Sequence, residues 1–408
     1  QVNVAQGAEV LLAATTFTAG AVNNAGKITV IGNDSFVQAA ATISGNWQVD
    51  NGRLFIEGAQ RIGALTLNGG TLAGRGTVTA DQLNFNGGTL SSGTFLTGGT
   101  TNVQGATSFN GQANQALVYS YTLNLNGDST WTAGNGRISV ESGYSSGSTS
   151  YPSSVLHIAS GTTFSDLGAA SSTGYKTLGG GTVLNDGLLT RSGFGATEAR
   201  GLVNQGTIHV SGGSLGVDDR FSNAGAVTVD SGTMLYALNS TLRNAGLLSG
   251  NGTVRTYSAA YALTNAGTLA PGSAAAPIGT LTINGDLRST DTATFSVDLG
   301  AGGEADRLVI TDDVLWNGTL SINATPGVSL HVGDSYVIAT FAQRLSNSMF
   351  DTVTWHGATG TQFAVEYNAH DLTLRVTAAV PEPSQWALLV GGLLAVGWRA
   401  RRRLPAAH

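Results

Sequence analysis

A repeat of about 20 residues is the feature that most limits what this chain can fold into. The tripeptide Asn-x-Gly recurs at intervals of 19, 19, 21 and 21 residues, with an apolar residue two positions before and four positions after each asparagine. Alternating apolar residues repeated at such a period are typical of a solenoid, in which each repeat forms one coil. The repeated asparagines are Asn185, Asn204, Asn223, Asn244 and Asn265, and the glycines that complete the tripeptide are Gly187, Gly206, Gly225, Gly246 and Gly267.

The repeat predicts an all-β fold, a parallel β-helix with coils of about 20 residues. A leucine-rich repeat can have this length, but its recurrent leucine framework is absent. No segment long enough to form a helix has apolar residues at helical spacing. The chain contains 58 glycines in 408 residues and only 11% charged residues, which suits short strands joined by tight turns. Successive coils are expected to stack at roughly 4.8 Å, giving one continuous core over residues 1–285.

The asparagine column can be interpreted in two ways. Stacked asparagine side chains can hydrogen-bond to one another along a buried ladder, as they do in cross-β structures. Alternatively, they are turn residues on the outside, because Asn and Gly tolerate the left-handed conformation that a corner can require. Both interpretations give the column a structural role.

The 20-residue rhythm fades after about residue 285, and longer alternating strands follow. The runs 363–367 and 372–376 flank a sequence, 368–371, that is typical of a hairpin turn. We therefore predict an antiparallel β cap over residues 286–378. A solenoid needs an atypical end unit to cover its last core layer.

The C-terminal residues 379–408 combine a proline-rich motif, an uncharged run and an arginine cluster. The run 386–398 contains no charge and has tryptophan at both ends, which suits the two interfaces of a membrane. We predict one short transmembrane helix, with the arginines left in the cytoplasm. The motif is Val380-Pro381-Glu382-Pro383, the ends of the run are Trp386 and Trp398, and the arginines are Arg399, Arg401, Arg402 and Arg403.

This tail resembles a PEP-CTERM sorting signal in all three parts. The resemblance implies recognition by a membrane-embedded exosortase, cleavage near residues 381–383 and transfer to the cell surface or matrix. The body, with L-x-G-x-G-T-V at residues 72–78 and 248–254 and a closing segment at 267–287, is similar to the autotransporter-associated β-strand repeat. Because no run of about a dozen amphipathic membrane strands follows, we do not expect a self-translocating autotransporter.

Catalytic and metal-binding motifs are missing from the sequence. There is no cysteine, no HExxH, no GxSxG and no P-loop, and the histidines share no spacing. Without the four tail arginines and Glu382, the 19 basic and 25 acidic residues become 15 and 24, which argues against binding to nucleic acid. We predict no cofactor and no enzymatic activity.

Two acidic segments are candidates for a binding site. The segment 218–220 (Asp-Asp-Arg) is expected to be a solvated turn, and the Asn repeat places Asp218 opposite Ala199, between Glu198 and Arg200. The segment 302–306 contains Gly, Glu and Asp in the manner of a calcium-binding coil, but it occurs once, whereas such sites need stacked copies.

The sequence thus predicts an exported surface or matrix protein of a Gram-negative bacterium, structural or adhesive, whose signal peptide has been removed before Gln1. Its expected partners are exosortase, the membrane before cleavage, and extracellular polysaccharide in a biofilm. Exposed aromatic residues could stack on sugars, among them Trp47, Trp131, Tyr144 and Tyr151. The alternatives are a polysaccharide lyase or hydrolase and an ice-binding protein.

Overall fold

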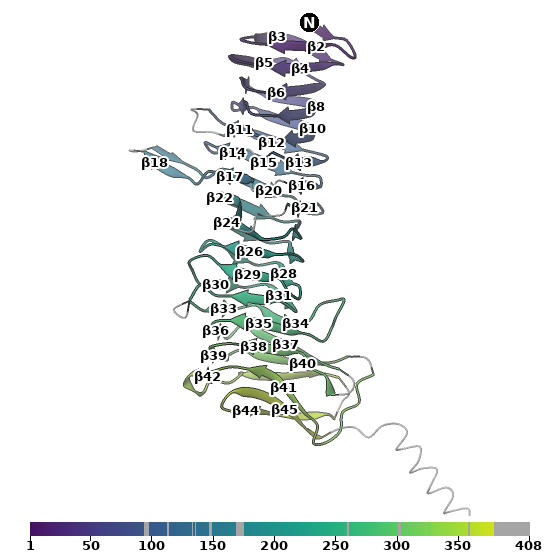
Figure 1. The fold of residues 1–408 in the computed structure, drawn as a ribbon, viewed down its shortest axis with the longest axis vertical. Helices are drawn as coiled ribbons and strands as arrows, with labels where there is room; N and C mark the ends of the chain where they lie inside the picture. The colour runs from purple at the N-terminus through teal and green to yellow at the C-terminus, as the bar shows by residue number, and fades with distance from the viewer. Residues whose placement is uncertain are drawn as a thin grey trace, which may run out of the picture.

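The computed structural model is a long β-solenoid. It describes residues 1–378 except 94–97, 112–113, 133, 135, 147–148, 169–174, 259–260, 301–302, 326 and 358–359. About 14 coils of roughly 21 residues stack into one column that starts at the N-terminus (Figure 1). The all-β, parallel β-helical fold predicted from the repeat is confirmed. The predicted membrane helix lies outside the described residues.

Each coil contributes up to three strands, and each strand pairs in parallel with its counterpart one coil further on. The strands therefore form three long sheets, which we call the groove sheet, the asparagine sheet and the third sheet. The groove sheet contains β7 (Arg53–Ile56), β9 (Thr71–Ala73), β11 (Gly88–Ser91), β14 (Gln115–Val118), β17 (Arg137–Val140), β26 (Ser214–Val217), β29 (Met234–Ala237), β32 (Thr253–Arg255), β35 (Thr280–Asn284), β38 (Arg307–Ile310) and β41 (Ser335–Thr340).

The asparagine sheet contains β1 (Val2–Val4), β12 (Thr100–Val103), β15 (Thr122–Leu125), β20 (Val155–Ile158), β27 (Ser222–Asn223), β30 (Leu242–Asn244), β33 (Leu263–Asn265), β36 (Leu287–Ser289), β39 (Asp313–Leu315) and β42 (Gln343–Arg344). Six longer strands bend around a corner and pair in two sheets. These are β3 (Thr16–Asn24), β5 (Asp34–Ile43), β8 (Ala59–Leu67), β10 (Thr77–Phe85), β22 (Tyr175–Asn185) and β24 (Ala196–Asn204).

The third sheet completes the column, and a 3-10 turn, η2 (Leu345–Asn347), follows β42. The third sheet contains β2 (Glu9–Leu12), β4 (Lys27–Val30), β6 (Asn46–Val49), β13 (Thr107–Phe109), β16 (Ser129–Trp131), β21 (Thr163–Asp166), β23 (Leu188–Arg191), β25 (Thr207–Val210), β28 (Ala226–Val229), β31 (Leu247–Gly250), β34 (Thr268–Pro271), β37 (Thr294–Leu299), β40 (Thr319–Ala324) and β43 (Thr352–His356).

Inward side chains of successive coils stack into a continuous core. The apolar residues four positions after the repeated asparagines share one register and are all buried. They are Leu189, Ile208, Val227, Leu248 and Leu269. Burying one such side chain contributes roughly 1.5–3 kcal/mol, so the alternation in each short strand is enough to fix which face turns inward.

The glycines of the Asn-x-Gly repeat have a different role from the one expected. They do not adopt a positive φ, and neither do the asparagines. A Cβ on Gly225 would lie 2.0 Å from the carbonyl oxygen of Gly206, and one on Gly246 would lie 2.0 Å from that of Gly225. Glycine is therefore required because the coil corners stack backbone on backbone, and the expected left-handed turn is wrong.

The predicted antiparallel cap begins later than residue 286. β37 pairs in parallel with β34 and β40, and β40 pairs in parallel with β43, so parallel pairing continues to His356. Alternation reports which face is buried but not the direction of the partner strand, which explains the difference. Antiparallel pairing joins β41 to β45 (Asp371–Ala378) and β45 to β44 (Gln362–Tyr367), with the expected hairpin between β44 and β45.

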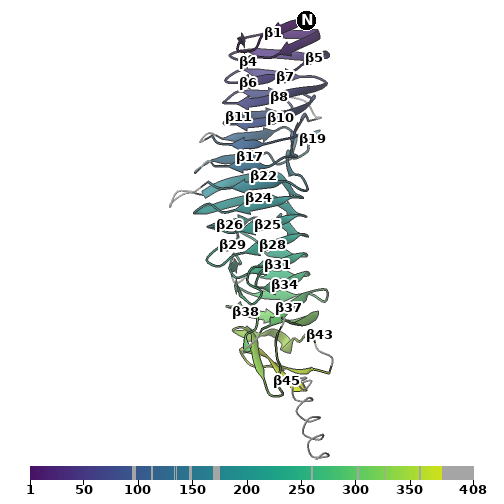
Figure 2. The same ribbon diagram turned by 90° about the vertical axis from the view of Figure 1, so that its right-hand side faces the viewer.

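Figure 1 shows β41, β44 and β45 at this end of the column, and Figure 2 shows β45 there from the side. A second irregularity lies near the middle. The antiparallel hairpin of β18 (Tyr144–Ser146) and β19 (Thr149–Tyr151) projects sideways from the column between β17 and β20 (Figure 1). It is the only two-stranded sheet separate from the column among the described residues.

Candidate functional site

The asparagine column forms a buried ladder. Asn185 Nδ2 donates to Asn204 Oδ1 at 2.7 Å, Asn204 to Asn223 at 2.7 Å, and Asn223 to Asn244 at 2.7 Å. Asn244 donates in turn to Asn265 at 2.7 Å. All five side chains are buried, so the structure has the first of the two arrangements considered for this column. Their hydrogen-bonding capacity is directed at their own chain, which makes the column structural.

A charged cluster lies inside the column, where the third sheet ends and the groove sheet begins. The carboxylate of Asp166 is bonded to Lys176 Nζ and accepts a 2.6 Å hydrogen bond from Thr197 Oγ1, and Arg191 Nε lies 3.5 Å from its Oδ2. Lys176 Nζ also lies 3.6 Å from the ring centroid of Trp131. Burial lowers the pKa of Lys176, and the Asp166 carboxylate opposes that shift. These five residues, called here the buried ion cluster, are shielded from solvent.

The outer face of the groove sheet carries a polar hollow of about 350 Å³, which we call the arginine groove. It spans β17, β22 and β24 and the turn after β26, and Ser142, next to the projecting hairpin, lines one side. Gly179 and Gly180 lie at its floor and add no side chain. The side chains that give it its chemistry are Arg137, Tyr175, Thr177, Arg200, Asp218 and Arg220.

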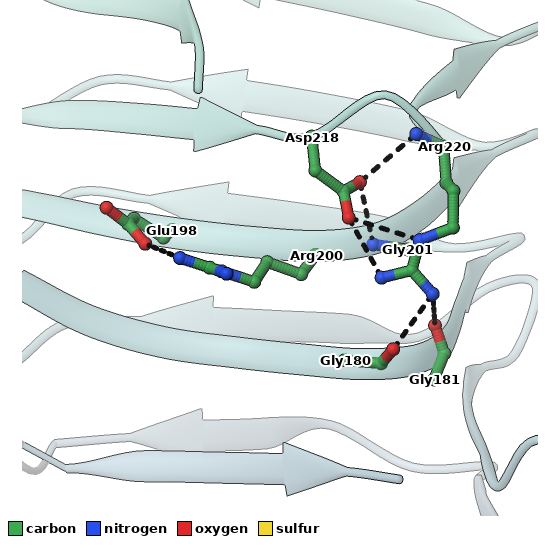
Figure 3. Close-up of polar contacts among 7 residues, drawn as sticks. All are labelled: Gly180, Gly181, Glu198, Arg200, Gly201, Asp218 and Arg220. Atoms are coloured by element: carbon green, nitrogen blue, oxygen red, sulfur yellow. Dashed lines mark hydrogen bonds and ion pairs between the residues drawn. The ribbon is translucent and has the colours of Figure 1, made fainter. Parts of the chain in front are cut away.

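Two arginine–carboxylate pairs, shown in Figure 3, supply Arg200, Arg220 and Asp218 to the lining of the groove, and Glu198 lies beside it. Arg200 Nη2 lies 2.7 Å from Glu198 Oε2, and Arg220 Nη2 lies 2.8 Å from Asp218 Oδ2. The carboxylates are sheltered, with side chains 12% and 11% exposed, whereas the two guanidinium side chains are 47% and 45% exposed. The hydrogen bond to Glu198 raises the pKa of Arg200 above its ordinary value. The arginines therefore remain charged and face the solvent.

Arg220 and Arg200 differ in how many of their guanidinium N–H donors are free of hydrogen bonds to the protein. Arg220 also donates through Nη1 to the carbonyl oxygens of Gly180 at 2.8 Å and Gly181 at 3.3 Å (Figure 3). Asp218 Oδ1 accepts from the backbone N–H of Gly201 at 2.9 Å. Arg220 thus ties three coils together, while Arg200 uses a single nitrogen in its bond to Glu198.

A column of outward residues that contains one aromatic ring extends from Glu198, beside the groove, toward the C-terminal coils. Glu198, Gly216, Tyr236 and Arg255 occupy one outward register on β24, β26, β29 and β32. A Cβ on Gly216 would lie 2.6 Å from Tyr236 Cζ, so the tyrosine ring lies over this glycine. Arg255 lies 5.2 Å from the centroid of the same ring. Burial, and then the charge of Glu198, raise the pKa of Tyr236 and keep its phenol neutral.

The position of Asp218 predicted from the asparagine spacing is wrong by one residue. Asp218 was expected opposite Ala199 and in a solvated turn. Instead Ala199 pairs with Val217, so Asp218 lies beside Arg200, and its carboxylate is largely buried. The longer turn between β26 and β27 restores the asparagine register, since Asn204 still pairs with Asn223. The groove sheet and the asparagine sheet therefore have different repeat lengths between these two coils, so the asparagine spacing alone does not give the pairing of Asp218 with Arg200.

Several residues proposed for sugar contact are not available. Trp47 and Trp131 are 1% and 0% exposed, so the expectation that they could stack on a sugar is wrong. Their large apolar rings fill the interior of the coils. Tyr144 and Tyr151 are on the projecting hairpin. Tyr175 is 56% exposed in the groove and was not singled out from the sequence, because it does not recur at the coil period.

The remaining polar sites do not assemble a catalytic or metal centre. In the part of the chain that the structure describes, no three His, Asp or Glu side chains gather in a way that could hold a metal ion. His157 and His209 each lie 2.9 Å from an aspartate, Asp186 and Asp230. Asp306, in the segment weighed for calcium, binds backbone N–H groups of Gly279 and Asp298. Both of its oxygens are therefore already occupied.

The predicted sorting residues lie outside the described part of the chain. They are Val380, Pro381, Glu382 and Pro383, the helix ends Trp386 and Trp398, and the arginines Arg399, Arg401, Arg402 and Arg403. Among the described residues, no helix is long and apolar enough to cross a membrane.

Comparison with known protein families gives the tail its identity. Residues 379–403 match the PEP-CTERM protein-sorting motif. No curated protein matches the chain. The motif implies processing by exosortase and an exported protein that its C-terminal tail anchors transiently. The chain is therefore a β-solenoid that carries a PEP-CTERM sorting motif at its C-terminal end.

Proposed function

We propose that this protein is a structural or adhesive component of the cell surface or extracellular matrix of a Gram-negative bacterium, where it associates with exopolysaccharide in a biofilm. The observation that carries the proposal is the sorting motif at residues 379–403 on a repetitive solenoid. A column of stacked coils presents long faces to an extended polymer and needs no disulfide, which suits an exported chain without cysteine.

The described polar groups support a structural role. The asparagine ladder and the buried ion cluster are buried, and their hydrogen bonds and ion pairs are made within the chain. Asp218 in the lining of the arginine groove and Glu198 beside it are each held by an arginine. A general base must reach the proton that it removes, and these two carboxylates are engaged in ion pairs instead.

Fractionation of cells that produce the chain with a different tag at each end tests the sorting step. We expect the N-terminal tag at the surface or in the matrix, separated from the C-terminal tag. The matched variant replaces Pro381, Glu382 and Pro383 with alanine and is expected to keep both tags on one membrane species. If the unmodified chain also keeps both tags together at the inner membrane, the proposal is wrong.

A polysaccharide-degrading enzyme is the rival function, and the arginine groove is the observation that favours it, since such enzymes use one face of a β-helix. Incubating the purified chain with the polysaccharide of its producer separates the two. Unchanged polymer length is expected for a structural protein. Depolymerisation that is lost on Glu198→Gln or Asp218→Asn would establish the enzyme.

Polar columns on the third sheet give the ice-binding alternative only a short row of threonines. One outward column places Thr190, His209, Thr228 and Ser249 on successive coils and is interrupted by the histidine and the serine. A second column places Thr268, Thr294, Thr319 and Thr352 on four successive coils. Thermal hysteresis of the purified chain, measured against its buffer, would revive this alternative.

A further inference from the structure

The arginine groove is an exception on an acidic body. Outside the tail the chain has 15 basic and 24 acidic residues, after removal of the four tail arginines and Glu382 from 19 and 25. In the groove three arginines face two carboxylates, Asp218 in its lining and Glu198 beside it. Such a local excess of positive charge attracts anions to this part of the surface.

Arg137 supplies the uncompensated charge. It is exposed on β17 at the groove wall, and the described residues offer it no ion-pair or hydrogen-bond partner. Arg200 is bonded to Glu198 through Nη2 alone, so its Nε and Nη1 donors are available. A guanidinium with free donors binds a carboxylate through two parallel hydrogen bonds, which a neutral sugar cannot match.

The spacing of these groups suits an extended ligand. Arg137 lies on β17, Tyr175 on β22 and Arg200 on β24, and these strands pair in that order. The two arginines are therefore two coils apart, roughly 10 Å along the column at the strand spacing, and they are offset by two residues because Arg137 is in register with Thr177 and Glu198. Tyr175 lies on the middle strand, two residues before Thr177, and is 56% exposed, so its ring offers an apolar surface on which a sugar ring can stack.

We propose that the arginine groove is the binding site for an acidic polysaccharide, with uronate carboxylates bound by Arg137 and Arg200 and a sugar ring stacked on Tyr175. This inference rests on the proposed function, because it names the site and the chemical class of the polysaccharide. Arg220 is a positioning residue, since its donors already hold Asp218 and the carbonyl oxygens of Gly180 and Gly181.

Calorimetric titration of the purified full chain in detergent with polygalacturonate oligomers tests the proposal. Arg137→Ala is expected to weaken binding about tenfold, and Arg137→Glu more, as the loss of one charge-assisted contact implies. Because Arg137 has no partner among the described residues, these variants leave the fold unchanged. Arg243→Ala is the matched control, because Arg243 is also exposed without a described partner but lies on β30 of the asparagine sheet.

The probes distinguish recognition from charge alone. Polygalacturonate should bind, neutral dextran should not, and dextran sulfate should bind more weakly and lose its affinity first as salt is raised. Equal affinity for dextran and polygalacturonate, or an equal effect of Arg137→Ala and Arg243→Ala, would overturn the proposal. Binding of dextran sulfate that matches polygalacturonate at every salt concentration would overturn the preference for carboxylates.

Fractionation separates a failure of this inference from a failure of the proposed function. The Arg137→Ala chain should be sorted and cleaved as the unmodified chain is, but it should be released from the matrix into the medium. If it stays in the matrix, the groove is not the binding site, although the proposed function stands. If the unmodified chain never leaves the inner membrane, the proposed function fails while the titration still decides the groove.

Discussion

The same coils use polar side chains in two opposite ways. On β24, Asn204 points into the column and Arg200 points out of it, four residues apart. Asn204 donates hydrogen bonds to Asn223 and to the carbonyl oxygen of Ala226. Arg200 donates to Glu198 through one nitrogen, and its other nitrogens face the solvent. The interior polar groups therefore determine stability, and the groove determines what the surface can bind.

The largest effect is expected in the buried ion cluster. Asp166→Ala leaves Lys176 and Arg191 buried without a counter-charge, which should lower the free energy of unfolding by about 3–5 kcal/mol. Urea denaturation followed by circular dichroism measures the change. Asp34→Ala, which removes an exposed ion pair with Arg53, is the control and should cost about 0–1 kcal/mol. Similar losses in both variants would contradict the contrast between interior and surface.

The asparagine ladder should come next. Asn204→Ala removes one of the two hydrogen bonds of the Asn185 amide, which still donates to Thr207, and leaves Asn223 Oδ1 without its donor in the interior, at a cost of about 1–3 kcal/mol. The control is Asn86→Ala, which removes the exposed hydrogen bond from Asn86 to Asn68 and should change stability little. If Asn204→Ala unfolds at the same urea concentration as the unmodified chain, the ladder does not stabilise the column.

A pH effect tests Asp306, a buried carboxylate that has no cationic partner among the described residues. Burial raises the pKa of Asp306 from 3.8 to about 7. The folded state then holds a proton that the unfolded state has released, so the stability from this group is complete at low pH and falls as pH rises from 3.8 to about 7. Asp306→Asn should remove this slope in unfolding curves collected across that range, whereas Asp291→Asn, an exposed site in the turn before β37, should not. An unchanged slope in Asp306→Asn would assign the pH dependence to other groups.

The smallest effect on stability is expected at the groove. Arg137→Ala should change the free energy of unfolding by less than about 0.5 kcal/mol, because an exposed side chain without a partner contributes little to stability. Arg220→Ala should cost more, since it removes bonds to Asp218, Gly180 and Gly181. Parallel urea curves for the two variants measure the difference. Equal losses would show that Arg137 is a structural residue after all.

The sequence predicts best what every coil repeats. Asn204 and Ile208 recur in register because each must stack on its counterpart in the next coil. The burial of Ile208 could be predicted from spacing, whereas spacing alone left both a buried ladder and an outer turn open for Asn204. The groove could not be predicted in this way, because Arg137 and Tyr175 occur once and a single-residue shift moves Asp218 beside Arg200. The direction of the strands after residue 286 was predicted wrongly, because apolar and polar residues alternate in the same way in parallel and antiparallel sheets.

The asparagine ladder also has a direction. Each amide nitrogen donates to the next side chain and to a backbone carbonyl on the following coil, those of Thr207, Ala226, Leu247 and Thr268, so every amide has the same orientation. Asn185 Oδ1 accepts from no described donor, because Ile158 occupies the preceding position. Aligned dipoles polarise one another along such a row. The row can thus be extended toward the N-terminus only by a residue that donates, whereas at its other end an acceptor is enough.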